Sequence, residues 1–482
     1  MAMPNDDRRA SFVGQWWLPG EPSKTFAGTL DIGQRAELQL YESTDAPRRG
    51  GDRDRFNPPI LHGRSMGSYL TLLDCTEVGW TSASGRGEHE EIHRNVAVGT
   101  ALVGDSHLDG VEDCRFNRAS LRLNNLDQWV NRSPYRWTTT PTESVEVLDL
   151  PTLRASIPGC EIFLDRRTSV RMGRLTDSGF TSHEVIELHF AERHALDELE
   201  YRFIRPLEQL LTLAVGSRCA ALELRVGNGD PSVPWPENWP RASYAVRRTS
   251  SDVAEAGRRV IREHMRFGMN STGYPPSVDF GSIVQRWYAL QEGLSSICDL
   301  IFSLRSDTAG YLEQQMFTIA SAIEGLHRGL NPQLEEKTDE DRARNKQILA
   351  AVKTGCPDHH QWLANVIQYA HRRSYVFRVR ELLRDTSHLM AAIVGDEEAW
   401  TQQLRDIRDG IGHVLLSQDA KTFHQVVAML YSGQLFAEVV LLRQLGFTDA
   451  QCRRSIEHHW ERQNVRALVQ KGFPEWFTIG PV

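Results

Sequence analysis

An arginine and a histidine, Arg408 and His413, are separated by four residues late in the chain, and their side chains suit phosphodiester chemistry. The histidine imidazole takes or gives a proton near neutral pH, and the guanidinium stays charged and offers forked donors to a phosphate group. On a helix these two positions lie roughly 140° apart, so both can border one groove. The pair therefore predicts a site with His413 as acid or base and Arg408 as the phosphate ligand.

The residues around this pair indicate a helix over residues 397–416. Apolar side chains recur there at helical spacing and leave Arg408 and His413 off the centre of the stripe that faces a core. Gly410 and Gly412 each cost a helix about 1 kcal/mol relative to alanine. Two glycines in one turn indicate a close approach by a second backbone or a nucleic-acid strand, or a local distortion. The apolar stripe consists of Leu404, Ile407, Ile411, Val414 and Leu415.

The spacing of Arg408 and His413 resembles the Arg-x4-His signature of the HEPN-domain ribonucleases. In that family the helix that carries the motif pairs with its symmetry mate, and the two motifs build one composite, metal-independent site for cutting RNA. A second segment, residues 317–328, resembles a helix of the ApeA-type HEPN proteins. These are bacterial anti-phage proteins.

The N-terminal half resembles the ApeA N-terminal region at residues 14–19, 28–30, 62–63 and 69–75. Together with the two later segments, these stretches follow the order expected for the family. The resemblance implies a sensor or regulatory region followed by a HEPN domain, with no cofactor. It also implies that phage infection triggers RNA cleavage, which halts host translation and growth.

The resemblance also implies a mechanism for the Arg408 and His413 pair. One helix supplies a single histidine, so two subunits would provide both acid and base, and we expect a homodimer or a higher oligomer. Attack by the 2′-hydroxyl would leave a 2′,3′-cyclic phosphate and restrict cleavage to RNA. Asp409 occupies the polar position after the arginine and is expected to orient the site. Transfer RNA is the family-level candidate substrate.

Less specific interpretations of these residues remain open. Arg408 could pair with Glu324, which lies at the edge of the core stripe of its own helix, and this pair would orient Arg408 without doing chemistry. His413 could be a surface or structural residue. The whole protein could be a HEPN bundle that binds RNA or a protein partner without cutting, or a carbohydrate- or ligand-binding β-sandwich, which the twelve tryptophans favour.

The composition of the 482 residues is that of a globular protein with two or three domains. A net charge of −8 excludes a generally basic nucleic-acid coat and leaves room for a local basic patch. The seven cysteines are scattered, which argues against a disulfide framework. We find neither an apolar run of the length of a membrane span nor a signal peptide, and expect a cytoplasmic protein without membrane contact.

The hydrophobic pattern divides the chain into a β-rich part and a helical part. Short apolar runs broken by Gly, Pro, Asn and Asp up to about residue 190 predict a β-sandwich or an open barrel, including a hairpin over residues 25–41. One helix with a break at Pro206 should span residues 195–215. We expect an α+β protein with an N-terminal region 1–275, with a further split near 145 as an option, and a HEPN-like bundle at 276–482.

Helical periods predict the elements of this bundle, beginning with a core stripe from Trp287 to Ile301. A second helix over 311–330 should end at Asn331 and Pro332. Further helices are expected at 335–346, 362–369, 376–393, 397–416, 421–442 and 449–468.

Two other groups of residues have chemically useful types. Cys356, His359 and His360 together with His458 and His459 could assemble a zinc site, although their spacing is not that of a zinc finger, and we expect no metal. A group of arginines near residue 380 could guide RNA to the groove or form a solvated face paired with Glu381 and Asp385. This group consists of Arg372, Arg373, Arg378, Arg380 and Arg384.

Overall fold

A computed structural model describes residues 10–33, 35–44, 55–84, 90–140, 144–171, 179–230, 243–248, 260–270, 276–305, 310–412, 420–457 and 459–477. The chain forms two compact units. The first comprises residues 1–211, 218–260 and 279–285, and the second comprises 212–217, 261–278 and 286–482. Each unit is made of three separate segments of the sequence. The domain boundary at residue 275 and the split near residue 145 stay predictions.

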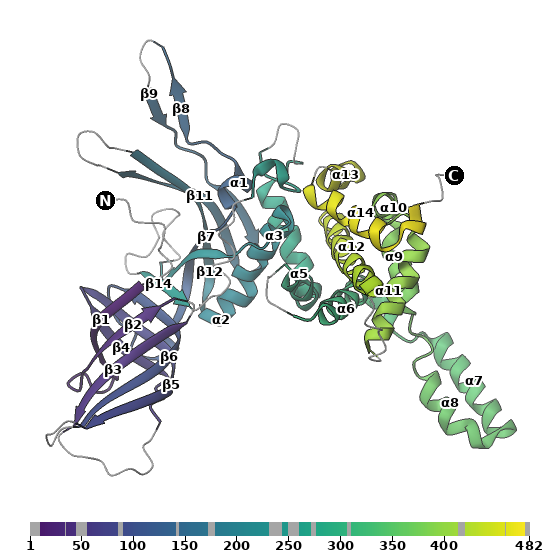
Figure 1. Cartoon of the computed structure of the whole chain (residues 1–482), viewed down its shortest axis with the longest axis horizontal. Helices are drawn as coiled ribbons and strands as arrows, with labels where there is room; N and C mark the ends of the chain where they lie inside the picture. Colours follow the sequence, from purple (N-terminus) through teal and green to yellow (C-terminus); the bar gives the residue numbers. More distant parts are fainter. Residues whose placement is uncertain are drawn as a thin grey trace. The chain divides into compact units, whose positions relative to one another are not determined.

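The first unit begins with a closed six-stranded barrel (Figure 1). Its strands are β1 (Ala10–Trp17), β2 (Phe26–Ile32), β3 (Ala36–Thr44), β4 (Ile60–Ser65), β5 (Ser68–Ser84) and β6 (Glu90–Gly104). They pair in the order β6-β3-β2-β1-β4-β5, and β5 returns to β6 to close the barrel. The β2–β3 hairpin predicted from alternation is present, with Leu30 paired to Leu38. Inward-facing side chains at every second position fill the barrel core.

Glycines let the β1 strand approach its neighbours closely inside this barrel. A Cβ atom added to Gly63 on β4 would lie 2.2 Å from the Trp16 indole of β1. A Cβ atom added to Gly28 on β2 would lie 3.0 Å from the Trp16 indole. The segments that resemble the ApeA N-terminal region at residues 14–19, 28–30 and 62–63 therefore meet around one buried tryptophan.

The same sheet continues from β6 into an open part through β14. Residues 90–97 of β6 pair with β3, whereas residues 100–103 pair with β14, so β6 belongs to both parts. The open part has the order β10-β11-β12-β7-β13-β14. Its strands are β7 (Arg115–Leu123), β10 (Leu153–Ile157), β11 (Cys160–Arg171), β12 (Gly179–Ala195), β13 (Ala221–Gly227) and β14 (Ser243–Arg248). A separate hairpin joins β8 (Tyr135–Thr138) to β9 (Ser144–Val147).

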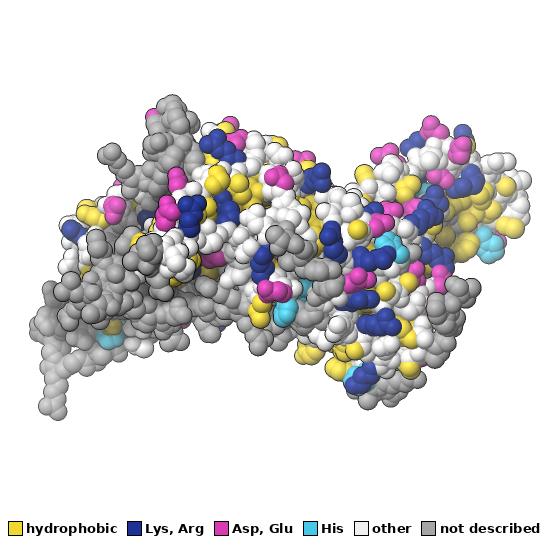
Figure 2. Space-filling model, turned by 90° about the horizontal axis from the view of Figure 1, so that it is seen from above, with side chains coloured by type: hydrophobic (Ala, Val, Ile, Leu, Met, Phe, Trp, Pro, Cys, Tyr) yellow, Lys and Arg dark blue, Asp and Glu magenta, His cyan; other side chains and the backbone are white. Residues whose placement is uncertain are grey.

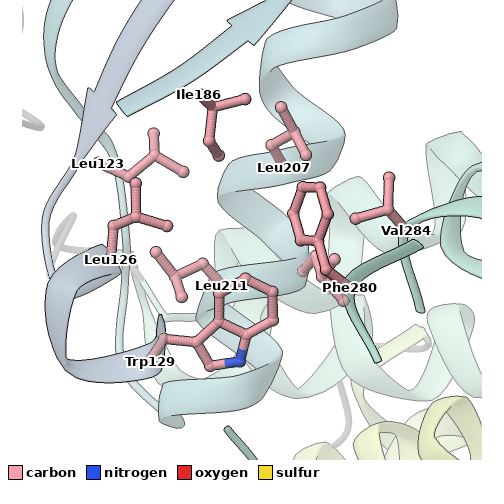
Figure 3. Close-up of a pocket in the computed structure, with 9 residues that line it drawn as sticks. Leu123, Leu126, Trp129, Ile186, Leu207, Leu211, Phe280 and Val284 are labelled. Atoms are coloured by element: carbon pink, nitrogen blue, oxygen red, sulfur yellow. The ribbon is translucent and has the colours of Figure 1, made fainter. Parts of the chain in front are cut away.

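Helices cover one face of the open sheet and enclose a small apolar pocket (Figure 3). They are α1 (Leu126–Val130), α2 (Leu196–Leu199) and α3 (Arg205–Val215), of which α1 and α3 line the pocket together with Phe280 and Val284. Leu207 and Leu211 of α3 face Leu123 and Ile186 of the sheet, and the pocket volume is only about 10 Å³. A space of that size holds one water at most, and its apolar lining offers such a water no partners. The pocket is a small gap in the apolar packing between the sheet and the helices.

The helix predicted over residues 195–215 does not break at Pro206. A π-helical turn, η2 (Glu200–Ile204), joins α2 to α3 without interruption. Proline lacks the N–H group that an α-helix needs and its ring collides with the preceding turn. The wider turn immediately before Pro206 accommodates this ring, so the chain remains helical.

The second unit is a helical bundle (Figure 1). Its helices are α5 (Phe280–Ser303), whose first residues lie in the first unit, α6 (Leu312–Leu330), α7 (Asp339–Gly355), α8 (His360–Ile367), α9 (Tyr375–Arg384), α10 (Ser387–Val394), α11 (Glu397–Gly412), α12 (Ala420–Gln444), α13 (Asp449–Glu457) and α14 (Trp460–Gly472). The predicted core stripe on α5 is present, with Trp287, Leu294 and Ile301 buried. The second helix ends at Asn331 as expected.

Two helices predicted as single elements are each divided in the structure. The helix expected over 376–393 becomes α9 and α10, because the Thr386 hydroxyl bonds to the carbonyl groups of Leu382 and Leu383 where α9 ends. The helix expected over 449–468 becomes α13 and α14, because the His459 side chain accepts a bond from the Glu461 N–H group and caps α14. Side chains that bond to the backbone in this way compete with helix continuation.

The central helix α12 corrects one expectation. The window Phe423–Gln444 is long and apolar enough to cross a membrane by length and composition, which the sequence analysis did not find. In the structure 83% of this window is buried among the other helices. This burial is typical of the core helix of a globular bundle.

Candidate active site

The helix α11 fixes the position of Arg408 through three buried side chains. Trp400, Leu404 and Ile407 stand at helical offsets of 0, 4 and 7 and are at most 4% exposed. The Trp400 indole also donates a hydrogen bond of 2.9 Å to the Ser432 hydroxyl of α12. Arg408 directly follows Ile407, and its side chain remains 29% exposed at the border of this core stripe.

The guanidinium of Arg408 is held on several sides. Its Nη2 atom donates a hydrogen bond of 2.6 Å to the Glu324 carboxylate on α6. The guanidinium carbon lies 4.9 Å from the ring centre of Tyr375, a buried residue at the start of α9. Asp409 lies 3.4 Å from the Nη1 atom. The ion pair between Glu324 and Arg408 that the sequence left open is therefore present, and it fixes the plane of the guanidinium.

Glu324 is the meeting point of three arginines. Besides Arg408, the Nη2 atom of Arg328 lies 3.4 Å from its carboxylate and the Nε atom of Arg378 lies 3.9 Å from it. A second carboxylate, Glu335, contacts both Arg378 and Arg328. The hydrogen bond from Arg378 lowers the pKa of Glu335. With Asp409 beside Arg408, three arginines meet three carboxylates, so the formal charges of the cluster balance.

A buried histidine supports this cluster from the α6 side. His327 is 0% exposed, and its Nε2 atom lies 2.8 Å from the Glu381 carboxylate of α9. The Nη1 atom of Arg378 donates to His327 Nδ1 at 3.3 Å. The imidazole therefore joins two charged side chains and is inaccessible to a substrate.

His327, Tyr375 and Arg378 are neighbours of Arg408 that were not predicted from the sequence. The segment 317–328 contained a usable signal, since His327 and Arg328 directly follow the helix stripe that includes Glu324. Tyr375 and Arg378 occupy one turn of α9, and no spacing rule connects α9 to α11. Their positions follow from the packing of α6 and α9 against α11.

His413 lies outside the described residues, as do Val414 and Leu415. The helix α11 is described as far as Gly412, the residue before His413. Asp409 is described, and its side chain is 52% exposed beside Arg408. The structure thus describes Arg408, Asp409 and Glu324 of the candidate site. The position and role of His413 as its acid–base group remain predictions.

The arginine group near residue 380 is not one guiding surface. Arg378 is buried among the carboxylates described above. Arg384 lies 3.4 Å from Glu381, as the solvated-face interpretation expected, whereas Arg380 pairs with Glu398, which that interpretation did not name. Arg372 and Arg373 are exposed and lie over the rings of Tyr369 and Phe377.

The residues considered for zinc binding are not assembled into one site in the described part of the second unit. Cys356 is exposed at the end of α7, whereas His459 is buried and bonded near Val215 and Glu461. Burial lowers the pKa of His459 to about 3. His458 lies outside the described residues. Among the described residues, no group of three or more His, Cys, Asp or Glu side chains is placed to hold a metal ion.

Comparison with protein families gives two matches along the chain. The model for ApeA N-terminal domain 1 matches residues 11–240, which contain the barrel and most of the open sheet. The model for the Apea-like HEPN domain matches residues 317–451, which contain Glu324, Arg408 and His413. No curated protein and no solved structure matches the chain. With an ApeA N-terminal domain followed by an Apea-like HEPN domain, the chain has the architecture of the ApeA-type HEPN anti-phage defence proteins and belongs with them.

Proposed function

We propose that the protein is an endoribonuclease of HEPN type that acts in anti-phage abortive infection. Arg408 and His413 from two subunits form one composite site, which cuts RNA without a metal ion or cofactor. The N-terminal domain senses or regulates, and a phage-derived trigger activates the enzyme in the cytoplasm. The proposal rests on the HEPN match over residues 317–451 and on the resemblance of Arg408 and His413 to the family motif.

The observation that carries the proposal is the fixed, partly exposed guanidinium of Arg408. Glu324 and Tyr375 set its orientation, and its exposed part can donate hydrogen bonds to a phosphate. A planar guanidinium that is oriented before the substrate binds stabilises the charge that develops on a pentavalent phosphate. The incoming phosphate would bind Arg408 beside the Glu324 carboxylate, which keeps the guanidinium oriented.

In the proposed reaction the 2′-oxygen of the RNA attacks the adjacent phosphorus. The bond between the 2′-oxygen and phosphorus forms, and the bond to the 5′-oxygen breaks. One His413 takes the proton of the 2′-hydroxyl, and the His413 of a second subunit gives a proton to the leaving 5′-oxygen. The products are a 2′,3′-cyclic phosphate and a 5′-hydroxyl, so DNA is not a substrate.

An assay on mixed RNA that includes transfer RNA tests the proposal. Arg408→Ala and His413→Ala should each abolish cleavage while the circular dichroism spectrum is unchanged. Arg405→Ala is the matched control, because Arg405 lies one turn earlier on α11 and pairs with its exposed neighbour Asp406. Cleavage that survives both changes would overturn the Arg408 and His413 site, whereas RNA binding without any cleavage by the wild type would leave a HEPN bundle that binds RNA without cutting it.

A further inference from the structure

Four polar side chains link α6 to α9 next to the candidate site. Glu324 and His327 stand one turn apart on α6, and Arg378 and Glu381 stand one turn apart on α9. The His327 imidazole contacts both side chains of α9, with Arg378 at 3.3 Å and Glu381 at 2.8 Å. The Nε atom of Arg378 lies 3.9 Å from the Glu324 carboxylate. These contacts form a continuous row that ends at Glu324, the partner of Arg408.

The partners of His327 determine which of its two ring nitrogen atoms carries the proton. The Arg378 guanidinium can only donate hydrogen bonds, so the Nδ1 atom that faces it must accept one. The Glu381 carboxylate accepts a hydrogen bond, so the Nε2 atom that faces it donates. Both contacts are satisfied by a neutral imidazole with its proton on Nε2. A proton on Nδ1 would set two donors against each other in the protein interior.

The Arg378 guanidinium is fully buried and is held by three acceptors. Its Nε atom donates a hydrogen bond of 3.2 Å to the Arg373 carbonyl group. Its Nη1 atom donates to His327 and to Glu335. Loss of the acceptor on His327 would leave a buried N–H group without its partner, which costs free energy unless the guanidinium moves. The His327 Nδ1 atom therefore helps to keep Arg378 beside Glu324.

The two oxygen atoms of the Glu324 carboxylate have different partners. Oε1 lies 3.9 Å from Arg378 and 3.4 Å from Arg328. Oε2 accepts the hydrogen bond of 2.6 Å from Arg408. The cations at Oε1 fix the plane of the carboxylate, so Oε2 stays directed at Arg408. A displacement of Arg378 is therefore transmitted to Arg408 through a single carboxylate.

The surface of the helical unit does not carry one broad basic area on the face that Figure 2 shows. Among the coloured side chains of this unit, Lys and Arg are interspersed with Asp and Glu. The formal charges of the Arg408 cluster also balance. How well the site is prepared for a phosphate therefore depends on the orientation of single guanidinium groups.

We propose that His327 is a positioning residue of the nuclease. Its unprotonated Nδ1 atom holds Arg378 beside Glu324, and Glu324 in turn holds Arg408 in the orientation that the scissile phosphate needs. The imidazole itself does not contact RNA, because it is 0% exposed. A small displacement of a group that binds the reacting phosphate lowers the rate strongly. The inference rests on the proposed function in that Arg408 binds this phosphate.

Two substitutions in the full chain separate the two hydrogen bonds of His327. In His327→Asn the amide oxygen can take the place of Nδ1 and accept from Arg378. In His327→Gln the longer side chain can place its amide NH₂ group at the Nε2 position and donate to Glu381, and Arg378 then loses the acceptor. Both amides are neutral and smaller than the imidazole, so each variant is the structural control for the other.

Steady-state cleavage of a short RNA and thermal unfolding are measured for both variants. His327→Gln should lower kcat by about tenfold or more and leave KM unchanged, because Arg408 keeps its charge and loses its orientation. His327→Asn should retain most of the wild-type kcat, although the two variants unfold at similarly lowered temperatures. Equal kcat values in the two variants would assign His327 to helix packing alone and overturn the inference.

Labelling with phenylglyoxal, measured by mass spectrometry, reports on Arg408 without RNA. This reagent modifies accessible guanidinium groups, and Arg405, which pairs with Asp406 one turn earlier on α11, gives the reference rate. The ratio of Arg408 to Arg405 modification should rise in His327→Gln and keep the wild-type value in His327→Asn. A raised ratio in a protein that cuts no RNA supports the link from His327 to Arg408 and rejects the nuclease. An unchanged ratio in His327→Gln overturns the link, and RNA cleavage by the wild type would then still support the nuclease.

Glu381→Leu gives a second measurement if His327→Gln does not fold, because the Glu381 side chain is 23% exposed at the surface of α9. This substitution removes the acceptor that holds the Nε2 side of the His327 ring. The kcat should fall and the ratio of Arg408 to Arg405 modification should rise. Wild-type values of both quantities in Glu381→Leu would overturn the inference.

Discussion

The Glu324 carboxylate on α6 lies 2.6 Å from the Nη2 atom of Arg408 on α11, and these two side chains join the helices at the candidate active site. Arg328 and Arg378 approach the same carboxylate. Because three guanidinium groups share this carboxylate, its removal should change the orientation of all three. In the proposed reaction Glu324 is therefore a positioning residue, since it would act on the RNA through Arg408.

Replacement of Glu324 by glutamine should separate cleavage from binding. Glu324→Gln keeps the side-chain shape and removes the charge that orients Arg408, so we expect kcat to fall by about tenfold or more. The KM for RNA should stay constant or fall, because the cluster becomes more positive. Steady-state cleavage of a short RNA measures both values. Glu336 is exposed and lies beyond the end of α6 at Leu330. Glu336→Gln should therefore change neither kcat nor KM. A Glu324→Gln enzyme with the wild-type kcat contradicts the positioning role.

The Tyr375 ring, and not its hydroxyl group, should matter for the site. The hydroxyl oxygen is buried and has no hydrogen-bond partner, and burial raises the pKa of Tyr375, so the phenol stays neutral. Tyr375→Phe should therefore stabilise the fold by about 1 kcal/mol and leave kcat unchanged, because an unsatisfied buried hydroxyl is costly. Tyr375→Leu removes the ring under Arg408 and should lower kcat. Thermal unfolding and RNA cleavage test this pair, and a loss of activity in Tyr375→Phe would count against it.

Much of the fold could be predicted from sequence periodicity. Alternation over residues 25–41 gave the β2–β3 hairpin, and the stripe from Trp287 to Ile301 gave α5. The division of α9 from α10 escaped prediction because Thr386 ends a helix through its side chain while the apolar period continues. Closure of the barrel also escaped a definite prediction, since the β5–β6 pairing depends on contacts between whole strands.

Sequence patterns could identify residues of the candidate site within a single helix, but not the contacts between helices. Arg408 and Asp409 were found from one segment, and Glu324 from its place at the edge of the α6 stripe. His327 and Arg378 could not be assigned, because a buried charged residue has no sequence mark that separates it from an exposed one. Arg378 has the same type and spacing as its exposed neighbours, and packing alone places it at Glu335. The place of His413 stays a prediction.

A buried quartet of charges should set the stability of the helical unit. Arg266 and Arg305 each pair with Glu438 and Glu461 at 2.5 to 2.7 Å, and none of the four side chains is more than 10% exposed. Burial alone would raise the pKa of Glu461, but Arg305 and Arg266 outweigh it and lower the pKa to about 2. Glu461→Gln leaves an uncompensated buried charge and should lower the unfolding free energy by about 3–5 kcal/mol.

Urea unfolding followed by far-ultraviolet circular dichroism measures this loss. Asp339→Asn is the control, because the Asp339 and Arg342 pair is exposed and should contribute at most about 1 kcal/mol. Equal losses in Glu461→Gln and Asp339→Asn would show that the quartet is no more important than a surface pair.

Glu187 should make the N-terminal unit less stable as the pH rises. This carboxyl group is fully buried on β12, and burial raises its pKa to about 7 although Arg167 and Ser120 act in the opposite direction. Between about pH 4.5 and 7 the folded state binds more protons than the unfolded state, so stability falls across this window, by about 3 kcal/mol in total. Glu187→Gln cannot ionise and should lose this dependence.

Calorimetric unfolding of both proteins from pH 5 to pH 8 gives the difference that isolates Glu187. Burial lowers the pKa of the neighbouring His189 to about 3. The fold therefore loses stability as the pH falls below 6.5, the ordinary pKa of a histidine. That contribution is present in both proteins and cancels. Parallel pH profiles for the wild type and Glu187→Gln would rule out the assigned ionisation.

A methyl group at Gly63 should disturb the barrel more than one at Gly79. A Cβ atom at Gly63 would lie 2.2 Å from the Trp16 ring, which is 0% exposed and cannot move aside without shifting its neighbours. Overpacking of this kind costs about 1–3 kcal/mol, so Gly63→Ala should unfold at lower temperature and lower denaturant concentration. Gly79 lies on β5 of the same barrel and has no atom within 4 Å of an added Cβ, so Gly79→Ala should stay within about 0.5 kcal/mol of the wild type. If the two variants are equally stable, the close contact of β1 and β4 at Trp16 does not restrict residue 63.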